Sequence, residues 1–290
     1  MTNAKAVSYN ITMNRLDINK QSQIIRCLID GVSVRGTSRI TGASKVTILK
    51  LLADIGNACA EYQNKVFHDL TCKKIQADEI WAFCYAKQKN VPEEMQGQFG
   101  IGDIWTFTAI CADSKLIPSW HFGKRDTENA TVFMKDIASR MKHRVQLTTD
   151  GHKMYLEAVE DAFGSEIDFS QLIKLYGVSE GETEKRYSPA KCLGTEKINM
   201  IGNPNKKDIS TSYIERANLT MRMGIRRFTR LTNGFSKKFE NHMHSVALHF
   251  MYYNFCRIHQ TLRVTPAMEA GVTDRLWDIE DIIALMHIKV

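Results

Sequence analysis

The sequence lacks the features that mark disulfide-stapled, zinc-ribbon and membrane proteins. Its seven cysteines are scattered over 290 residues, and no two of them form a C-x-x-C pair. An odd set of isolated cysteines in a chain of this size argues against a disulfide framework and against a zinc ribbon. No apolar run reaches the roughly eighteen residues of a membrane span, and no basic-then-apolar leader opens the chain. We therefore expect a reduced, cytoplasmic protein with no membrane partner.

Acidic residues are missing from one long stretch that carries many bases. No acid follows Glu215 as far as Lys238, and seven bases stand in this stretch. They are Arg216, Arg222, Arg226, Arg227, Arg230, Lys237 and Lys238. Bases without acids repel one another along a helix unless a polyanion lies near, and Arg222, Arg226 and Arg230 recur at helical spacing. We expect Arg222 and the bases after it to contact DNA phosphates; a solvated helix face is the alternative.

The bulk composition fits a globular protein with a polyanionic partner. Hydrophobic residues make up 43% of the chain and charged residues 24%, which is ordinary for a soluble domain. The net charge is +7, and the isoelectric point is about 9.0. Such a balance favours nucleic acid without proving it.

Three short helical patterns open the ordered part of the chain. Apolar residues recur at helical spacing from residue 19 to Gly31, a second helix fits residues 34–41, and Gly42 breaks the chain before a third. Ser44 is placed to cap this third helix, whose expected buried residues are Val46, Leu49, Leu52 and Ile55. Residues 1–72 carry nine bases against five acids.

Three helices with a glycine turn before the last are typical of a helix-turn-helix, in which the third helix enters the major groove. In that geometry four residues of the third helix face DNA, and two bases of the second helix lie near phosphates. The four are Ser44, Lys45, Thr47 and Lys50, and the two are Arg35 and Arg39. The alternative is a plain three-helix bundle with a solvated basic face.

A different pattern begins after residue 72. Residues 73–87, 104–115 and 116–126 read as three strands, followed by a helix over 127–143, a strand over 145–151 and a helix over 155–164. This is the element order of a ribonuclease H-like core, with the first strand central and the fourth beside it. The predicted fold is therefore α/β: a ribonuclease H-like mixed sheet with flanking helices, preceded by an all-α helix-turn-helix domain.

The patterns divide the chain into four parts. Residues 1–60 form the helix-turn-helix domain, 61–72 a helical linker, 73–265 the catalytic domain and 266–290 a C-terminal tail. Within the catalytic domain, residues 165–211 contain one possible strand and a polar, glycine-rich segment, which we interpret as an insertion.

Three acids stand where this fold would bring them together. Asp78 interrupts an apolar strand, Asp150 ends the fourth strand before Gly151, and Glu215 leads the basic stretch. A buried carboxylate is costly unless it is paired or metal-bound, and carboxylate oxygens suit Mg²⁺. We expect the three acids to be catalytic and to hold two Mg²⁺ or Mn²⁺ ions for phosphodiester chemistry. Glu79 is the rival of Asp78 and would point to the opposite face of the strand.

Four histidines invite other interpretations. His242, His244 and His249 lie on an apolar helix, where a histidine is more often packed than a metal ligand, and no cysteine motif stands near them. His152 follows Asp150 closely. A contact with a phosphate or a role near the metal ions is one interpretation, and a plain turn residue is an equally good one.

The motifs DEIWAF, HFGKRDTENA, TTDGHKMY and YIERANLTMRMGIRRFTRLTNGFSKKFENH stand in this order between residues 78 and 255. Together they resemble the DDE-type transposases of the first-described bacterial insertion-sequence family, whose fold is similar to that of retroviral integrases. The resemblance implies that the family's catalytic acids correspond to Asp78, Asp150 and Glu215 and that Mg²⁺ is used to cut and join DNA at transposon ends. The chain lacks the cysteines of the family's N-terminal zinc-binding segment, so the helix-turn-helix would recognise the terminal repeats alone.

The resemblance implies a transposase that binds terminal inverted repeats of double-stranded DNA and transfers strands to a target. Pairing of two ends implies a homodimer or a larger synaptic complex, located at the bacterial nucleoid. Two alternatives remain: a catalytically inactive, sequence-specific DNA-binding regulator, and a ribonuclease H-like nuclease that cuts RNA–DNA hybrids.

Overall fold

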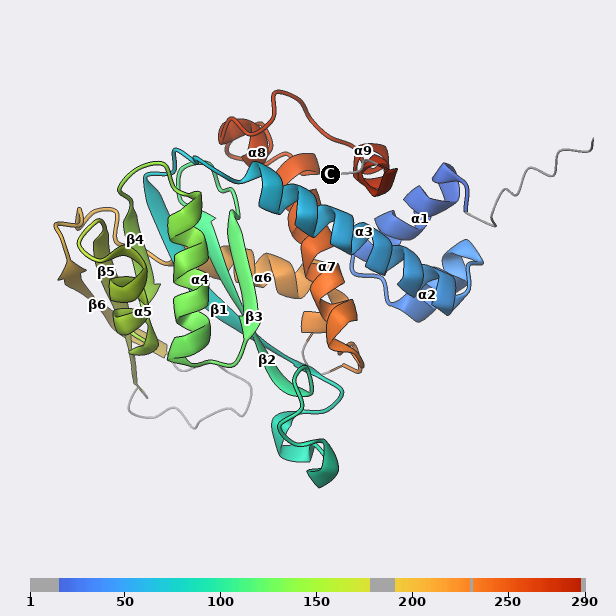
Figure 1. Cartoon of the computed structure of the whole chain (residues 1–290), viewed down its shortest axis with the longest axis horizontal. Coiled ribbons are helices and arrows are strands. Elements are labelled where there is room, and N and C mark those ends of the chain that lie inside the picture. The colour runs from blue at the N-terminus through green and yellow to red at the C-terminus, as the bar shows by residue number, and fades with distance from the viewer. Residues whose placement is uncertain (1–15, 178–190, 230–231, 288–290) are drawn as a thin grey trace, which may run out of the picture.

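The computed structural model describes residues 16–177, 191–229 and 232–287. In this part of the chain, a six-stranded mixed sheet lies beside a group of helices drawn from both ends of the sequence (Figure 1). The strands are β1 (Lys74–Cys84), β2 (Gly102–Cys111), β3 (Ser119–Gly123), β4 (Gln146–Asp150), β5 (Asp168–Gly177) and β6 (Lys191–Ile201). No described helix combines the length and apolar character needed to cross a bilayer.

The strand order is β3-β2-β1-β4-β5-β6. β1, β2 and β3 form an antiparallel meander, β4 runs parallel to β1, and β5 runs parallel to β4. This is the arrangement that the sequence predicts for a ribonuclease H-like sheet, with the first strand central and the fourth beside it. β6 pairs antiparallel with β5 and extends the sheet by one edge strand.

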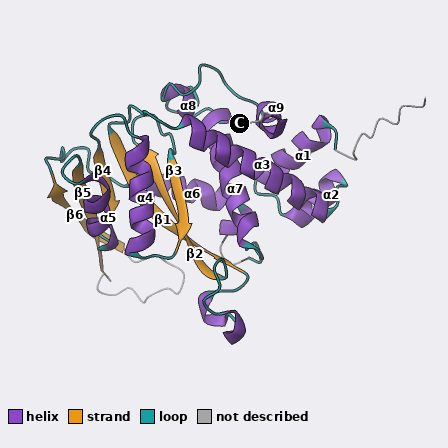
Figure 2. Ribbon diagram, in the orientation of Figure 1, coloured by secondary structure: helices purple, strands orange, loops and turns teal. Residues whose placement is uncertain are grey.

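Two pairs of helices cover the two faces of the sheet (Figure 2). α4 (Thr127–Arg140) and α5 (Met154–Phe163) lie on one face, and α6 (Ser212–Gly224) and α7 (Phe239–Met251) lie on the other. Side chains of β1 alternate between them: Ala77 belongs to the larger core, whereas Ile80 joins the core formed with α6 and α7. The alternation follows from the two-residue period of a strand, and it aims neighbouring acids of β1 in opposite directions.

The N-terminal helices are α1 (Ile18–Ile29), α2 (Val34–Thr41) and α3 (Lys45–Val66). Ser44 caps α3 as expected, because its hydroxyl accepts a hydrogen bond from the backbone N–H of Thr47 at 3.1 Å. Gly42 has a φ of 71°, the left-handed conformation that ends α2 and makes the turn. The prediction that Val46 is buried is wrong, because this residue is 78% exposed. The buried face of α3 includes Leu52 and Ile55, as predicted, but does not extend to Val46.

α3 continues to Val66 without a break, so residues 61–66 of the predicted linker belong to the same helix as the capping Ser44. The helix lies alongside α7 (Figure 1), and the approach is close at Gly56, where an added Cβ would sit 2.5 Å from the Cβ of His244. The N-terminal helices therefore share their core with the C-terminal half of the chain.

The remaining elements complete the helical side. α7 continues as a π-helical turn, η4 (Tyr252–Cys256), and α8 (Pro266–Glu269) and α9 (Ile279–Ala284) follow. The short 3₁₀ turns are η1 (Gln88–Asn90), η2 (Glu93–Met95), η3 (Arg226–Phe228) and η5 (Leu285–His287). The C-terminal tail docks on α1, where Ser22 donates a hydrogen bond to Glu280 at 2.7 Å.

Part of the predicted insertion at 165–211 belongs to the sheet, because it supplies β5 and β6. The segment 178–190 between these strands lies outside the described residues.

Candidate active site

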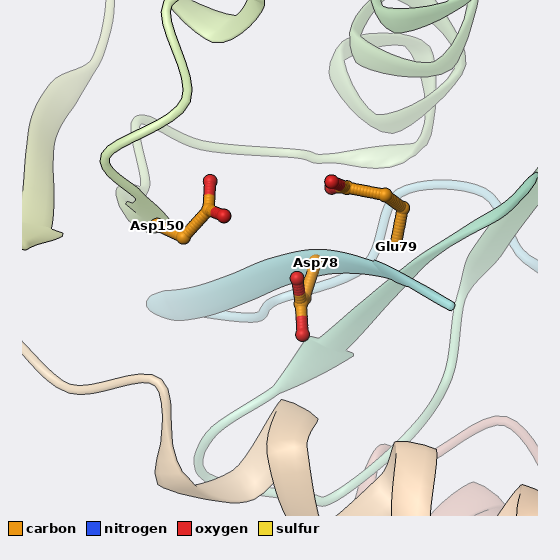
Figure 3. Close-up of side chains that lie close together, drawn as sticks. All are labelled: Asp78, Glu79 and Asp150. Carbon is orange, nitrogen blue, oxygen red and sulfur yellow. The ribbon is translucent and has the colours of Figure 1, made fainter. Parts of the chain in front are cut away.

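Asp78 and Asp150 meet because β1 and β4 are neighbours. The parallel ladder pairs Gln76 with Thr148, so each of the two strands reaches its aspartate two residues later. One carboxylate oxygen from each of Asp78, Glu79 and Asp150 lies within 4.8 Å of the others (Figure 3). The close trio of acids therefore includes Glu79, and Glu215 is not part of it.

Glu79 points to the opposite side of β1 from Asp78, as the sequence predicts (Figure 3). Its side chain is only 1% exposed, and both of its oxygens already have donors. Arg125 donates to Oε1 at 2.5 Å, and the hydroxyl of Tyr155 donates to Oε2 at 2.6 Å. Because these partners neutralise and occupy the Glu79 carboxylate, it serves as an anchor for Arg125 on the α4–α5 face.

Arg125 also links this anchor to the site. Its Nη2 lies 3.7 Å from Oδ2 of Asp150, and its guanidinium lies 4.8 Å from the centre of the Trp105 ring. Asp150 accepts a further hydrogen bond from the backbone N–H of His152 at 3.0 Å, which fixes the turn after β4. No signal in the sequence singles out Arg125, although it lies in the motif HFGKRDTENA.

Asp78 lies on the α6 side of the sheet and accepts a hydrogen bond from Nδ2 of Asn218 at 2.9 Å. Burial, followed by the negative charges of Glu79, Asp150 and Glu215, raises the pKa of the Asp78 carboxyl to about 7. Asn218 is itself buried, and within the described residues its Oδ1 has no hydrogen-bond partner. The metal-free site therefore contains an unneutralised carboxyl beside an unpaired amide oxygen.

Glu215 stands in the first turn of α6, one helical turn before Asn218. The backbone N–H groups of Tyr213 and Ile214 donate to Oε1 of Gln76 at 2.8 and 3.1 Å, which ties the start of α6 to β1. Oε1 of Glu215 accepts hydrogen bonds from Nζ of Lys174 at 2.5 Å and from the hydroxyl of Thr211. The sequence offers no signal for these partners, because they come from separate segments.

The three predicted acids line one cavity of about 550 Å³. We call it the acidic cavity. Asp78 and Asp150 line it from the ends of the two strands, and Glu215 lines it from α6, where it forms an ion pair with Lys174. The donor set fits a hard divalent cation, because it consists of carboxylate oxygens. Asp78 and Asp150 are the residues best placed to hold such an ion.

A second cavity, of about 730 Å³, lies between the N-terminal helices and the segment after Glu215. We call it the basic cavity, because its described lining residues include five bases and no acid. The bases are Arg35, Lys45, Arg226, Arg227 and Lys237. Two groups of predicted DNA-binding residues, far apart in the sequence, thus line one hollow.

The predicted DNA-binding residues of the N-terminal helices are mostly at the surface. Arg35, Arg39, Lys45 and Lys50 are exposed. Ser44 is also exposed, although its hydroxyl caps α3 and is 2.9 Å from the hydroxyl of Thr47.

The bases after Glu215 have different surroundings. Lys237 and Lys238 are exposed, whereas Arg222 and Arg226 are half-buried. Arg230 lies outside the described residues.

Arg227 has a structural environment. Its guanidinium donates to the hydroxyls of Ser245 at 2.6 Å and Ser236 at 2.7 Å, and burial lowers its pKa to about 10. Because these contacts tie the loop before α7 to that helix, a phosphate contact by Arg227 would require them to open.

The helix histidines are packed. His242, His244 and His249 are buried, and burial lowers the pKa of His242 to about 3 and that of His249 to about 4. Within the described residues, the one group of acids, histidines or cysteines close enough to hold a metal ion is the carboxylate trio, which contains none of them. His152 lines the acidic cavity, where its Nδ1 accepts from the backbone N–H of Met154 at 3.3 Å.

No protein-family model matches the chain, and no curated protein matches it. One solved structure that matches is the crystal structure of the Mos1 strand transfer complex, at 12% identity and a TM-score of 0.24. The match covers 50% of this chain and spans only 56% of that chain. A likeness this distant carries no argument, so the functional conclusion rests on the strand order and the site geometry.

Proposed function

We propose that the protein is a DDE-type DNA transposase of an insertion sequence, with Asp78, Asp150 and Glu215 as its catalytic acids. The observation that carries the proposal is that these acids, from β1, β4 and α6, line one cavity on a sheet with ribonuclease H-like strand order. Its Mg²⁺ or Mn²⁺ ions, two per site, would supply charge stabilisation and activation of the attacking oxygen.

The chain's own residues have distinct tasks in this proposal. Asp78 and Asp150 hold the cation, and Glu215 completes the donor set once its oxygen is released from Lys174. Arg125 holds Asp150 in place through its contact at 3.7 Å. Asn218 orients Asp78 by donating its amide hydrogen at 2.9 Å.

The basic cavity supports DNA as the substrate. Arg35 and Lys45 approach it from α2 and α3, and Arg226 and Lys237 approach it from the segment after α6. A hollow lined by bases without a described acid suits a phosphodiester backbone, whose binding depends on such charges. In the proposal, α3 reads the terminal inverted repeats through Ser44 and the exposed bases of its N-terminal half, and two copies of the chain bring two ends together.

The test is strand transfer with duplex oligonucleotides taken from the DNA that flanks the gene, in Mg²⁺. Asp78→Asn should retain binding in a gel-shift assay and lose strand joining. Asp161→Asn is the matched control, because Asp161 pairs with Lys135 on the surface at 2.8 Å, away from both cavities. Full joining by the Asp78 variant would remove the metal-site assignment.

The same assay separates the two alternatives. A regulator would protect one operator and show no Mg²⁺-dependent cleavage. A ribonuclease H-like nuclease would cut RNA–DNA hybrids and leave DNA ends unjoined.

A further inference from the structure

Lys174 is the one lysine or arginine among the described residues that line the acidic cavity. It projects from β5, and its Nζ lies 2.5 Å from Oε1 of Glu215. The side chains of Lys174 and Glu215 are 29% and 41% exposed, so the pair is accessible to solvent at the mouth of the cavity. The hydroxyl of Thr211 binds the same oxygen, which leaves Oε1 fully occupied.

The ammonium of Lys174 is both an ion-pair partner and a hydrogen-bond donor of Glu215. A cation already stands where Glu215 would meet a metal ion. Asp78, by contrast, has only the neutral amide of Asn218 as a side-chain hydrogen-bond partner among the described residues.

The two halves of the acidic cavity are therefore unequal. At Asp78 and Asp150, three carboxylates including Glu79 lie close together, so this half favours a cation. At Glu215, the charge is paired with Lys174 within the protein, so a divalent ion that binds Oε1 must first break an ion pair and a hydrogen bond.

We propose that Lys174 is a built-in competitor of the metal ion at Glu215, and that its release couples metal binding to DNA binding. The inference rests on the proposed function and deepens it. When a cation takes Glu215, the displaced ammonium needs another anion, and a DNA phosphate at the mouth of the cavity provides one. By linkage, DNA then strengthens metal binding, and metal strengthens DNA binding by the same factor.

The experiment is titration of the full-length protein with Mn²⁺ by calorimetry, with and without duplex DNA from the gene's flanks. The variants are Lys174→Met, which keeps an unbranched stem without the charge, and Lys174→Arg, which keeps the charge. Lys135→Met is the matched control, because Lys135 is an exposed lysine paired with Asp161 on the far helices.

Without DNA, Lys174→Met should bind Mn²⁺ at the weaker site at least about fivefold more tightly than the unmodified protein does. The reason is that the ion no longer has to break a partly exposed ion pair. DNA should strengthen Mn²⁺ binding in the unmodified protein and in Lys174→Arg, and much less in Lys174→Met. The Lys135 control should behave as the unmodified protein does. A merely structural role for Lys174 would change the melting temperature without changing the metal affinity or its dependence on DNA.

A double-mutant cycle protects the test from effects on folding. In the Glu215→Gln background the weaker Mn²⁺ step should be lost, and adding Lys174→Met should then have no further effect on Mn²⁺ affinity. Identical isotherms for the unmodified protein and Lys174→Met would overturn the inference alone. Mn²⁺ binding that is absent, or that is insensitive to Asp78→Asn, would instead overturn the proposed function.

Discussion

Asp78→Asn should stabilise the metal-free protein at alkaline pH. The pKa of the Asp78 carboxyl is raised from 3.8 to about 7, chiefly by burial, so ionising this group costs free energy in the folded state. Each tenfold change in a protonation equilibrium is worth about 1.4 kcal/mol, so the cost above pH 7 has an upper limit of about 4 kcal/mol. The substitution removes the ionisation, and the side-chain oxygen of the new asparagine can still accept the hydrogen bond from Nδ2 of Asn218.

The pH dependence has a definite sign. Between about pH 4 and pH 7 the folded protein holds the Asp78 proton while the unfolded chain has lost it, so stability falls as pH rises through this window. Above pH 7 both states are ionised, and the loss is complete. The gain from Asp78→Asn should therefore be small at pH 4.5 and reach its maximum near pH 8.

The assay is urea unfolding in EDTA at pH 4.5 and pH 8, followed by unfolding at pH 8 in Mg²⁺. We expect the substitution to raise the free energy of unfolding by about 2–4 kcal/mol at pH 8 without metal. Mg²⁺ should stabilise the unmodified protein and narrow this difference, because the ion favours the ionised carboxylate. An equal effect at both pH values, or a loss of stability at pH 8, would refute the reasoning.

Three further predictions concern the anchor, the DNA contacts and the helix packing. Arg125→Met should lower the free energy of unfolding by about 3–5 kcal/mol in urea titrations, because it leaves the buried carboxylate of Glu79 on β1 without its cation. An unchanged free energy of unfolding would mean that the hydrogen bond from Tyr155 alone stabilises Glu79. Arg35→Ala and Lys237→Ala should each weaken binding to all duplex sequences alike and reduce the slope of log affinity against log salt concentration by about 1. Fluorescence anisotropy at several salt concentrations measures this slope, and an unchanged slope would contradict contacts of these residues with phosphates. Gly56→Ala should lower the free energy of unfolding by about 1–3 kcal/mol, because the new methyl group would lie 2.5 Å from the Cβ of His244. Thermal unfolding measures this, and an unchanged melting temperature would show that α3 and α7 can move apart without cost.

The first four strands of the sheet are predictable from the sequence because they are regular and follow one another, with their helices, in a known order. Asp78 interrupts an apolar strand and Asp150 ends another, so their meeting follows from the expected pairing of the first and fourth strands. Neighbouring residues alternate along a strand, which also predicts that Glu79 points to the opposite face from Asp78, as Figure 3 shows.

The partners of these acids could not be read from the sequence. Lys174 reaches Glu215 from β5, and Gln76 binds the start of α6 from β1, so both contacts depend on tertiary packing rather than on spacing along the chain. Val46 was misassigned because helical periodicity alone does not identify which face of α3 meets α7. Likewise, the association of Arg35 with Lys237 at one cavity depends on how the N-terminal helices dock.

The most direct measurement compares Mn²⁺ binding and DNA joining in Glu215→Gln and Glu79→Gln. Either carboxylate is a candidate third ligand beside Asp78 and Asp150. Glu215 lines the acidic cavity, and Glu79 belongs to the trio of close oxygens. If Asp78, Asp150 and Glu215 share the metal site, the Glu215 variant loses the weaker Mn²⁺ step and strand joining, while the Glu79 variant keeps both Mn²⁺ steps. Loss of Mn²⁺ binding only in the Glu79 variant, with joining intact in the Glu215 variant, would contradict the account.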